Sequence, residues 1–101
     1  MQKKVKMFND ANRQKQMPIY ARLLDTASEL GELAKEYLKH SSYGAEDFEI
    51  DEEFKLEFGD VLYCLMALAN ELNIDAEEQL DKVIAKYQAR IDKKKSMGSE
   101  N

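Results

Sequence analysis

Apolar residues recur along this chain at spacings of three and four, which is the period of an amphipathic α-helix. The clearest stripe predicts a helix over about 19–40, and a second long helix is predicted over about 51–72. A third helix is predicted to end near residue 93. The residues of the first stripe are Leu23, Leu24, Ala27, Leu30, Ala34, Tyr37 and Leu38, and those of the last are Leu80, Val83, Ile84, Tyr87 and Ile91.

The breaks between these stripes carry recognisable end signals. Pro18 suits a first helical turn, where its missing N–H is no loss, and the segment 41–51 reads as a loop. Asp75 is a good N-cap, with Glu78 three residues on to complete a capping box. Residues 94–101 are polar and are expected to fray. We therefore expect a single domain over 1–101 with its core in about 18–92.

The remaining apolar residues predict a fourth, shorter helix and an interface. Residues 2–14 are expected to form a weaker helix with Val5, Phe8 and Met7 facing inward. Val61 to Ala69 is an unbroken run of nine apolar residues, which covers the whole circumference of a helix. Four short helices cannot easily enclose it, so a partner subunit should supply cover. The expected fold is all-α, a four-helix bundle completed by homodimer or homotetramer formation through the helix at 54–72.

Composition and charge narrow the function classes. The 101 residues suffice for one domain, and 35% of them are charged, with a net charge of −5. Residues 46–60 alone carry −7, so nucleic acid is not the expected ligand. The longest apolar run is far short of the ~20 residues that a membrane helix needs. A single Cys64 and the lack of an apolar segment behind the N-terminus favour a cytoplasmic location without membrane association.

Two stretches repeat each other and carry the candidate chemistry. Glu29-Leu-Gly-Glu32-Leu and Glu57-Phe-Gly-Asp60-Val each place two carboxylates three residues apart. Each also holds a glycine inside a helix, which costs about 1 kcal/mol relative to Ala. The glycines therefore suggest that a partner helix, or an ion with its ligand, approaches closely.

Glu57 falls on the apolar strip of its helix, where an uncompensated carboxylate is costly. If the two helices face each other, four acids converge and demand cations, and carboxylate-only sites suit Mg²⁺, with Mn²⁺ as the alternative ion. No His or Cys stands nearby in a ligand pattern, so a structural zinc site is not expected. The competing interpretation is an ordinary solvated acidic face.

A basic stripe on the last predicted helix is formed by Lys82, Lys86 and Arg90. By spacing alone it is also an ordinary solvated face. Next to a metal-bound polyphosphate, however, these side chains would supply cationic donors.

These residues resemble the MazG-like, all-α nucleoside triphosphate pyrophosphohydrolases, whose signature is E-x-x-E, a spacer and E-x-x-D. Here the pairs are Glu29-x-x-Glu32 and Glu57-x-x-Asp60, separated by 24 residues, and Lys86-x-x-x-Arg90 is similar to the basic pair of that family. Ser28 stands where many members have a further acid. The resemblance covers about 18–92.

The resemblance implies hydrolysis of a nucleoside triphosphate between the α and β phosphates, which yields a monophosphate and pyrophosphate. It implies that Glu29, Glu32, Glu57 and Asp60 hold Mg²⁺ as the catalytic cage, and that Lys86, Arg90 and, less directly, Lys82 contact the phosphates. It does not assign the general base. Two alternatives stay open: a phosphoribosyl-ATP pyrophosphohydrolase-like enzyme, and a non-catalytic helical module that dimerises and binds a partner.

Overall fold

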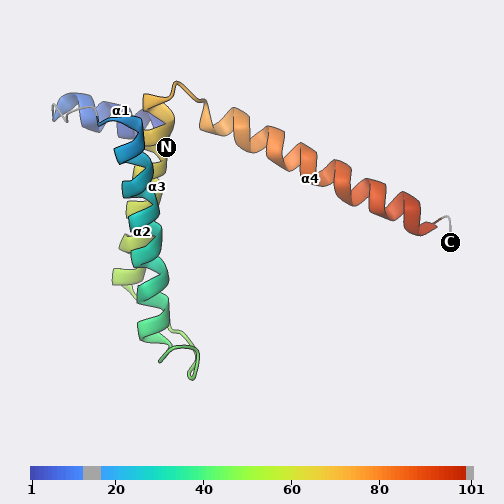
Figure 1. The fold of residues 1–101 in the computed structure, drawn as a ribbon, viewed down its shortest axis with the longest axis horizontal. Coiled ribbons are helices and arrows are strands. Elements are labelled where there is room, and N and C mark those ends of the chain that lie inside the picture. Colours follow the sequence, from blue (N-terminus) through green and yellow to red (C-terminus); the bar gives the residue numbers. More distant parts are fainter. Residues whose placement is uncertain (13–16, 100–101) are drawn as a thin grey trace.

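The computed structural model describes residues 1–12 and 17–99, and its described residues form four α-helices without any strand (Figure 1). The helices are α1 (Gln2–Ala11), α2 (Ile19–His40), α3 (Glu52–Glu71) and α4 (Ala76–Ser99). The all-α fold class with one short and three longer helices is therefore confirmed. The end predicted for the first helix, near residue 14, lies outside the described residues.

Helices α2 and α3 pack side by side in opposite directions and form the body of the molecule (Figure 1). After Ser41, the connection between them continues with three left-handed residues, at φ values of 50° for Ser42, 59° for Tyr43 and 89° for Gly44. The buried hydroxyl of Ser41 accepts from the Gly44 N–H and donates to the Leu38 carbonyl, which satisfies the end of α2. Further along, the ring of Phe48 lies 4.7 Å from the rings of both Tyr37 and Phe54. These aromatic contacts tie the loop to both helices.

The buried apolar side chains come from the second half of α3, namely Cys64, Met66, Ala67, Leu68 and Ala69. Helix α1 crosses this half of α3, and the Phe8 and Tyr63 rings meet edge to face at 6.2 Å, while the Tyr63 hydroxyl donates to Asn9. Of the three side chains expected to face inward from α1, Val5 is half-buried, whereas Met7 and Phe8 are exposed, Phe8 despite its contact with Tyr63. Part of the long apolar run thus finds cover within the chain, but Leu65 remains 45% exposed.

Helix α4 projects away from the other three (Figure 1). Asp75 accepts a hydrogen bond from the Glu78 N–H at 3.1 Å, so the predicted N-cap is confirmed. The helix continues to Ser99, past residue 94 where fraying was expected, because nothing before Gly98 disfavours a helix. The radius of gyration is 18.3 Å, well above the ~13 Å of a compact domain of this size. The apolar stripe of α4 consequently lies in solvent in the single chain.

Candidate metal and phosphate site

The antiparallel pairing of α2 and α3 brings acids from both helices together. Glu29 on α2 and Glu57 and Asp60 on α3 each offer a carboxylate oxygen, and these oxygens lie within 4.8 Å of one another. We call these three residues the acid cluster. Glu29 and Glu57 are half-buried, whereas Asp60 is exposed. Three of the four acids singled out in the sequence therefore converge, as the repeated spacing requires.

Glu32, the fourth predicted acid, lies outside the acid cluster but close enough to act on it. Partial burial, followed by the negative charges of Asp60 and Glu29, raises the pKa of Glu57 above its ordinary value, and Glu36 and Glu32 add to the effect. All four charges named here are negative, so their repulsion is relieved only by a proton or by a cation. The acid cluster thus has the oxygen-only donor set that Mg²⁺ prefers.

The glycines beside these acids face open space. A Cβ added at Gly31 or at Gly59 would meet no atom within 4 Å in the described part of the chain. The close approach that the sequence suggested is therefore not made by this chain's own atoms. The surface at both glycines is free to receive a ligand or another helix.

The basic stripe is not brought to the acid cluster within one chain. Lys82, Lys86 and Arg90 all lie on the projecting α4. Lys82 pairs with Glu78 at 3.0 Å, one turn away on the same helix, and the Lys86 ammonium lies 5.9 Å from the centre of the Tyr87 ring. Sequence spacing places these cations on one face of a helix but does not say where that helix points.

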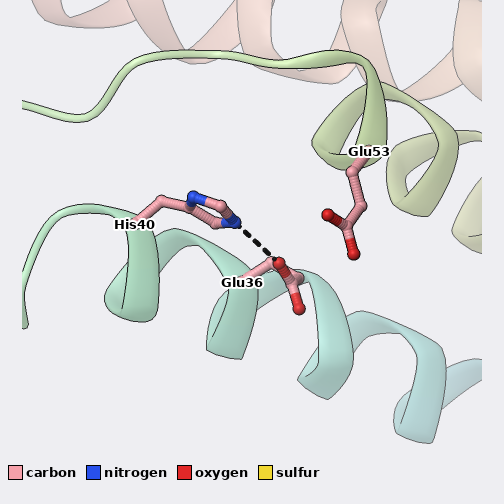
Figure 2. A group of neighbouring side chains, drawn as sticks. All are labelled: Glu36, His40 and Glu53. Carbon is pink, nitrogen blue, oxygen red and sulfur yellow. Dashed lines mark hydrogen bonds and ion pairs between the residues drawn. The ribbon is translucent and has the colours of Figure 1, made fainter.

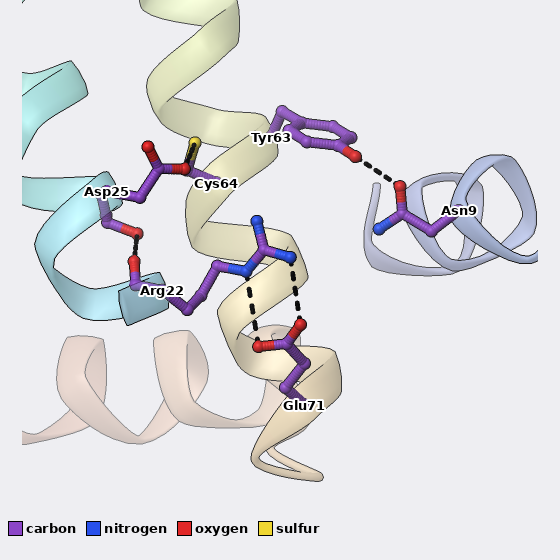
Figure 3. Close-up of polar contacts among 7 residues, drawn as sticks. Asn9, Arg22, Asp25, Tyr63, Cys64 and Glu71 are labelled. Atoms are coloured by element: carbon purple, nitrogen blue, oxygen red, sulfur yellow. Dashed lines mark hydrogen bonds and ion pairs between the residues drawn. The ribbon is translucent and has the colours of Figure 1, made fainter. Parts of the chain in front are cut away.

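Two polar contacts that the sequence did not reveal join α2 to α3 (Figure 3), and they involve residues of α3 that follow the acid cluster along the chain. Arg22 donates to both carboxylate oxygens of Glu71, at 3.0 and 3.4 Å, and both side chains are about nine-tenths buried. Cys64 donates through its thiol to Asp25 at 3.5 Å. Burial, and then the Asp25 carboxylate, raises the pKa of that thiol from 9.0 to about 11, which keeps it protonated as a donor.

A further group of polar side chains lies on the loop side of the acid cluster (Figure 2). Glu36 and His40 on α2 and Glu53 on α3 offer ligand atoms within 4.8 Å of one another. The sequence holds a signal for this group, because Glu36 follows Glu32 by four residues and Glu53 precedes Glu57 by four. The sequence analysis found no histidine in a ligand pattern near the acids, because the loop separates His40 and Glu36 from Glu53 in the sequence.

Comparison with known proteins is consistent with this architecture. The model of the MazG nucleotide pyrophosphohydrolase domain family matches residues 19–94. A crystal structure of YPJD from Bacillus subtilis, described there as a candidate pyrophosphatase, superposes with a TM-score of 0.72 and 32% identity. The superposition covers 88% of this chain and 84% of that one.

YpjD of Bacillus subtilis strain 168, whose activity is uncharacterized, is 42% identical over 66 residues, which are 61% of this chain and 57% of YpjD. The match therefore spans little more than half the length of this curated relative.

Within the described part of the chain, no helix combines the length and hydropathy needed to cross a bilayer. The matched residues include both acid pairs and the basic stripe, and this chain belongs to the MazG nucleotide pyrophosphohydrolase domain family.

Proposed function

We propose that this protein is a Mg²⁺-dependent pyrophosphohydrolase that cleaves a nucleoside triphosphate, ribo- or deoxyribo-, between its α and β phosphates. The observation that carries the proposal is the acid cluster, in which half-buried carboxylates from two helices converge without a compensating cation among the described residues. Structure alone does not favour such an arrangement, because the like charges repel. A metal ion bound with a triphosphate would offset this repulsion with its positive charge.

Glu29, Glu57 and Asp60 would hold the ion, with Glu32 adding negative charge beside it. When bound, Mg²⁺ supplies positive charge that polarises the phosphates and lowers the pKa of a coordinated water. In the reaction, a water oxygen forms a bond to the α-phosphorus and the bond to the bridging oxygen breaks. Pyrophosphate leaves, and the water proton passes to a base that the structure does not single out.

Cationic side chains are also needed, since charge spreads over the phosphoryl oxygens in the transition state. Lys86 and Arg90, with Lys82 beside them, suit this role, but α4 holds them away from the acid cluster of the same chain. We propose that a second copy of the chain completes the site, as a homodimer or as part of a homotetramer. The exposed faces of α3 and α4 support this arrangement.

These faces are apolar enough to bury in a subunit interface. On α4 the stripe residues are about half exposed, with values of 54% for Leu80, 55% for Ile84 and 52% for Tyr87. On α3, Phe58 and Leu65 are 56% and 45% exposed. An apolar hollow of about 770 Å³ lies between the two helices and the start of α1. Exposed apolar surface of this extent is typical of an interaction site.

The test of the reaction is a hydrolysis panel with Mg²⁺. It contains each common NTP and dNTP, dUTP, dITP, 8-oxo-dGTP and phosphoribosyl-ATP, with pyrophosphate and orthophosphate measured separately. We expect pyrophosphate release that Glu57→Gln abolishes and that Glu49→Gln, an exposed loop acid, leaves unchanged. Orthophosphate as the sole product would contradict α–β cleavage. Activity on phosphoribosyl-ATP alone would favour the biosynthetic alternative, and no activity at all would favour the binding module.

The test of assembly is the molar mass in solution, measured by light scattering across a range of protein concentrations. Ile84→Glu places a charge in the apolar stripe of α4 and should give monomers. Asp81→Asn, an exposed change on the same helix outside the apolar stripe and the hollow, serves as the control. A native protein that stays monomeric at every concentration would contradict the shared site.

A further inference from the structure

The loop-side group of Glu36, His40 and Glu53 differs in chemistry from the acid cluster. It combines one imidazole with two carboxylates, whereas the acid cluster is built from carboxylates alone. No residue is common to the two groups. Each carboxylate of this group lies one helical turn from a predicted metal acid, since Glu36 follows Glu32 and Glu53 precedes Glu57 at a spacing of four.

The side chains of this group point toward a common space between α2 and α3 (Figure 2). The Nε2 atom of His40 lies 3.0 Å from Glu36 Oε2, and the Glu53 carboxylate extends from α3 toward the same place. Among the described residues, no side-chain nitrogen of a lysine or arginine lies within 4.0 Å of a carboxylate oxygen of Glu36 or Glu53. A neutral imidazole would therefore leave two carboxylates without a compensating charge.

The surroundings of His40 hold its ring in place from the other side. Its Nδ1 atom faces Asp51 Oδ2 at 3.9 Å, and the ring packs edge to face against Phe48 at 6.3 Å. Asp51 is itself fixed, because its other oxygen caps α3 by accepting from the Phe54 N–H at 2.8 Å. In the metal-free protein the Nε2–H of His40 donates to Glu36, because a carboxylate oxygen accepts and lies 3.0 Å away. A divalent ion at Nε2 would displace that proton, and Asp51 behind the ring would then favour a proton on Nδ1, which is the usual outer arrangement of a metal-bound histidine.

We propose that Glu36, His40 and Glu53 form a second cation site, separate from the acid cluster, that binds a borderline divalent ion such as Zn²⁺ in preference to Mg²⁺. One nitrogen and two oxygen donors suit zinc, and magnesium prefers oxygen alone. The donor atoms lie within 4.8 Å of one another, and a tetrahedral ion needs them about 3.4 Å apart. Glu53 and His40 are exposed and Glu36 is half-buried, so side-chain rotation can close the difference.

His40 is the single histidine of the chain, so its ring signals in an NMR spectrum of the untagged protein need no assignment. The experiment titrates Zn²⁺ at a mildly alkaline pH, where a free imidazole is neutral, in a background of excess Mg²⁺ that occupies the acid cluster. We expect the ring signals to shift and saturate at one equivalent of Zn²⁺, and to be unmoved by Mg²⁺ alone.

Three variants separate this site from the acid cluster. Glu53→Gln removes one donor and should weaken Zn²⁺ binding at least about tenfold, while Asp51→Asn keeps the helix cap but loses the charge behind His40 and should also weaken it. Glu57→Gln should leave the response of His40 intact, even if it abolishes hydrolysis. Ring signals that ignore Zn²⁺, or that respond equally in Glu53→Gln, would overturn the proposal. The proposed hydrolysis would stand in either case.

Discussion

Near the end of α3 that leads to α4, the carboxylate of Glu71 is buried and receives two hydrogen bonds from Arg22 (Figure 3). About four turns down the same helix, Glu57 is half-buried and is surrounded by Asp60, Glu29 and other acids. The hydrogen bond and charge of the Glu71 carboxylate raise the pKa of Arg22, so the guanidinium stays charged. Loss of solvent contact, and then the like charges around it, raise the pKa of the Glu57 carboxylate. One acid is satisfied within the chain, and the other is not.

The Glu71 carboxylate therefore joins two helices, whereas the Glu57 carboxylate is available for a ligand. The α2–α3 pair can bury an acid with a matching cation, as Arg22 and Glu71 show. It supplies no such cation to the acid cluster. A carboxylate with a raised pKa that is grouped with other acids is typical of a functional site. Four measurements, from the largest expected effect to the smallest, test this contrast.

Removing the cation from the satisfied acid should have the largest effect on stability. Arg22→Met leaves Glu71 buried and unpaired, which should lower the free energy of unfolding by about 3–5 kcal/mol. Urea denaturation at fixed protein concentration measures this loss. Arg22→Met combined with Glu71→Leu should recover much of it, and Lys6→Met, which breaks a pair that is 64% and 67% exposed, should cost less than about 0.5 kcal/mol. A loss of under about 1 kcal/mol in Arg22→Met would show that the buried pair does not join the helices as inferred.

Supplying a cation to the acid cluster should stabilise the fold. Mg²⁺ at 100 times its Kd should raise the free energy of unfolding by about 2.7 kcal/mol, because it binds the folded state alone. Thermal unfolding with and without Mg²⁺ measures this gain. Glu57→Gln should reduce it strongly, whereas Glu49→Gln should not. An equal gain in both variants would place the ion elsewhere.

Replacing a glycine beside the acids should have a smaller effect, which raises stability but lowers activity. Gly59→Ala should stabilise the metal-free protein by about 1 kcal/mol, since the added Cβ meets nothing and alanine favours a helix. The same variant should lose hydrolytic activity if a substrate or a second copy approaches Gly59. Stability and kcat/KM are measured together on one preparation. A gain in stability with full activity would show that neither a substrate nor a second copy of the chain approaches Gly59 during catalysis.

The pH dependence of the metal-free protein should be the weakest effect. Because the folded state raises the pKa of Glu57, it binds that proton more tightly than the unfolded chain does. This contribution to stability is present below the ordinary pKa of 4.5 and is lost as the pH rises through the raised value. Denaturation in a chelator between about pH 4 and pH 8 should show the loss. Glu57→Gln should flatten it, and an unchanged slope would contradict the shift.

The repeated Glu-x-x-acid pattern with its glycine predicted that four acids of α2 and α3 would converge, and three of them do. Period and spacing fix the face of a helix on which Glu29, Glu57 and Asp60 lie. The end signals at Pro18 and Asp75 likewise follow from local chemistry, since each acts within one turn of its own helix. The sequence by itself thus determined the helices, most of their ends and the core of the acid cluster.

The tertiary structure decided what depends on residues distant in the sequence. The pairings of Arg22 with Glu71 and of Asp25 with Cys64 link residues 49 and 39 positions apart, and no local spacing indicates them. For Glu36 and Glu53 the spacing of four residues from the acid pairs is a signal, but only the register of the α2–α3 pair sets where they meet His40. The direction of α4 could not be predicted from the sequence either, because periodicity assigns a face to a helix but gives no angle between helices.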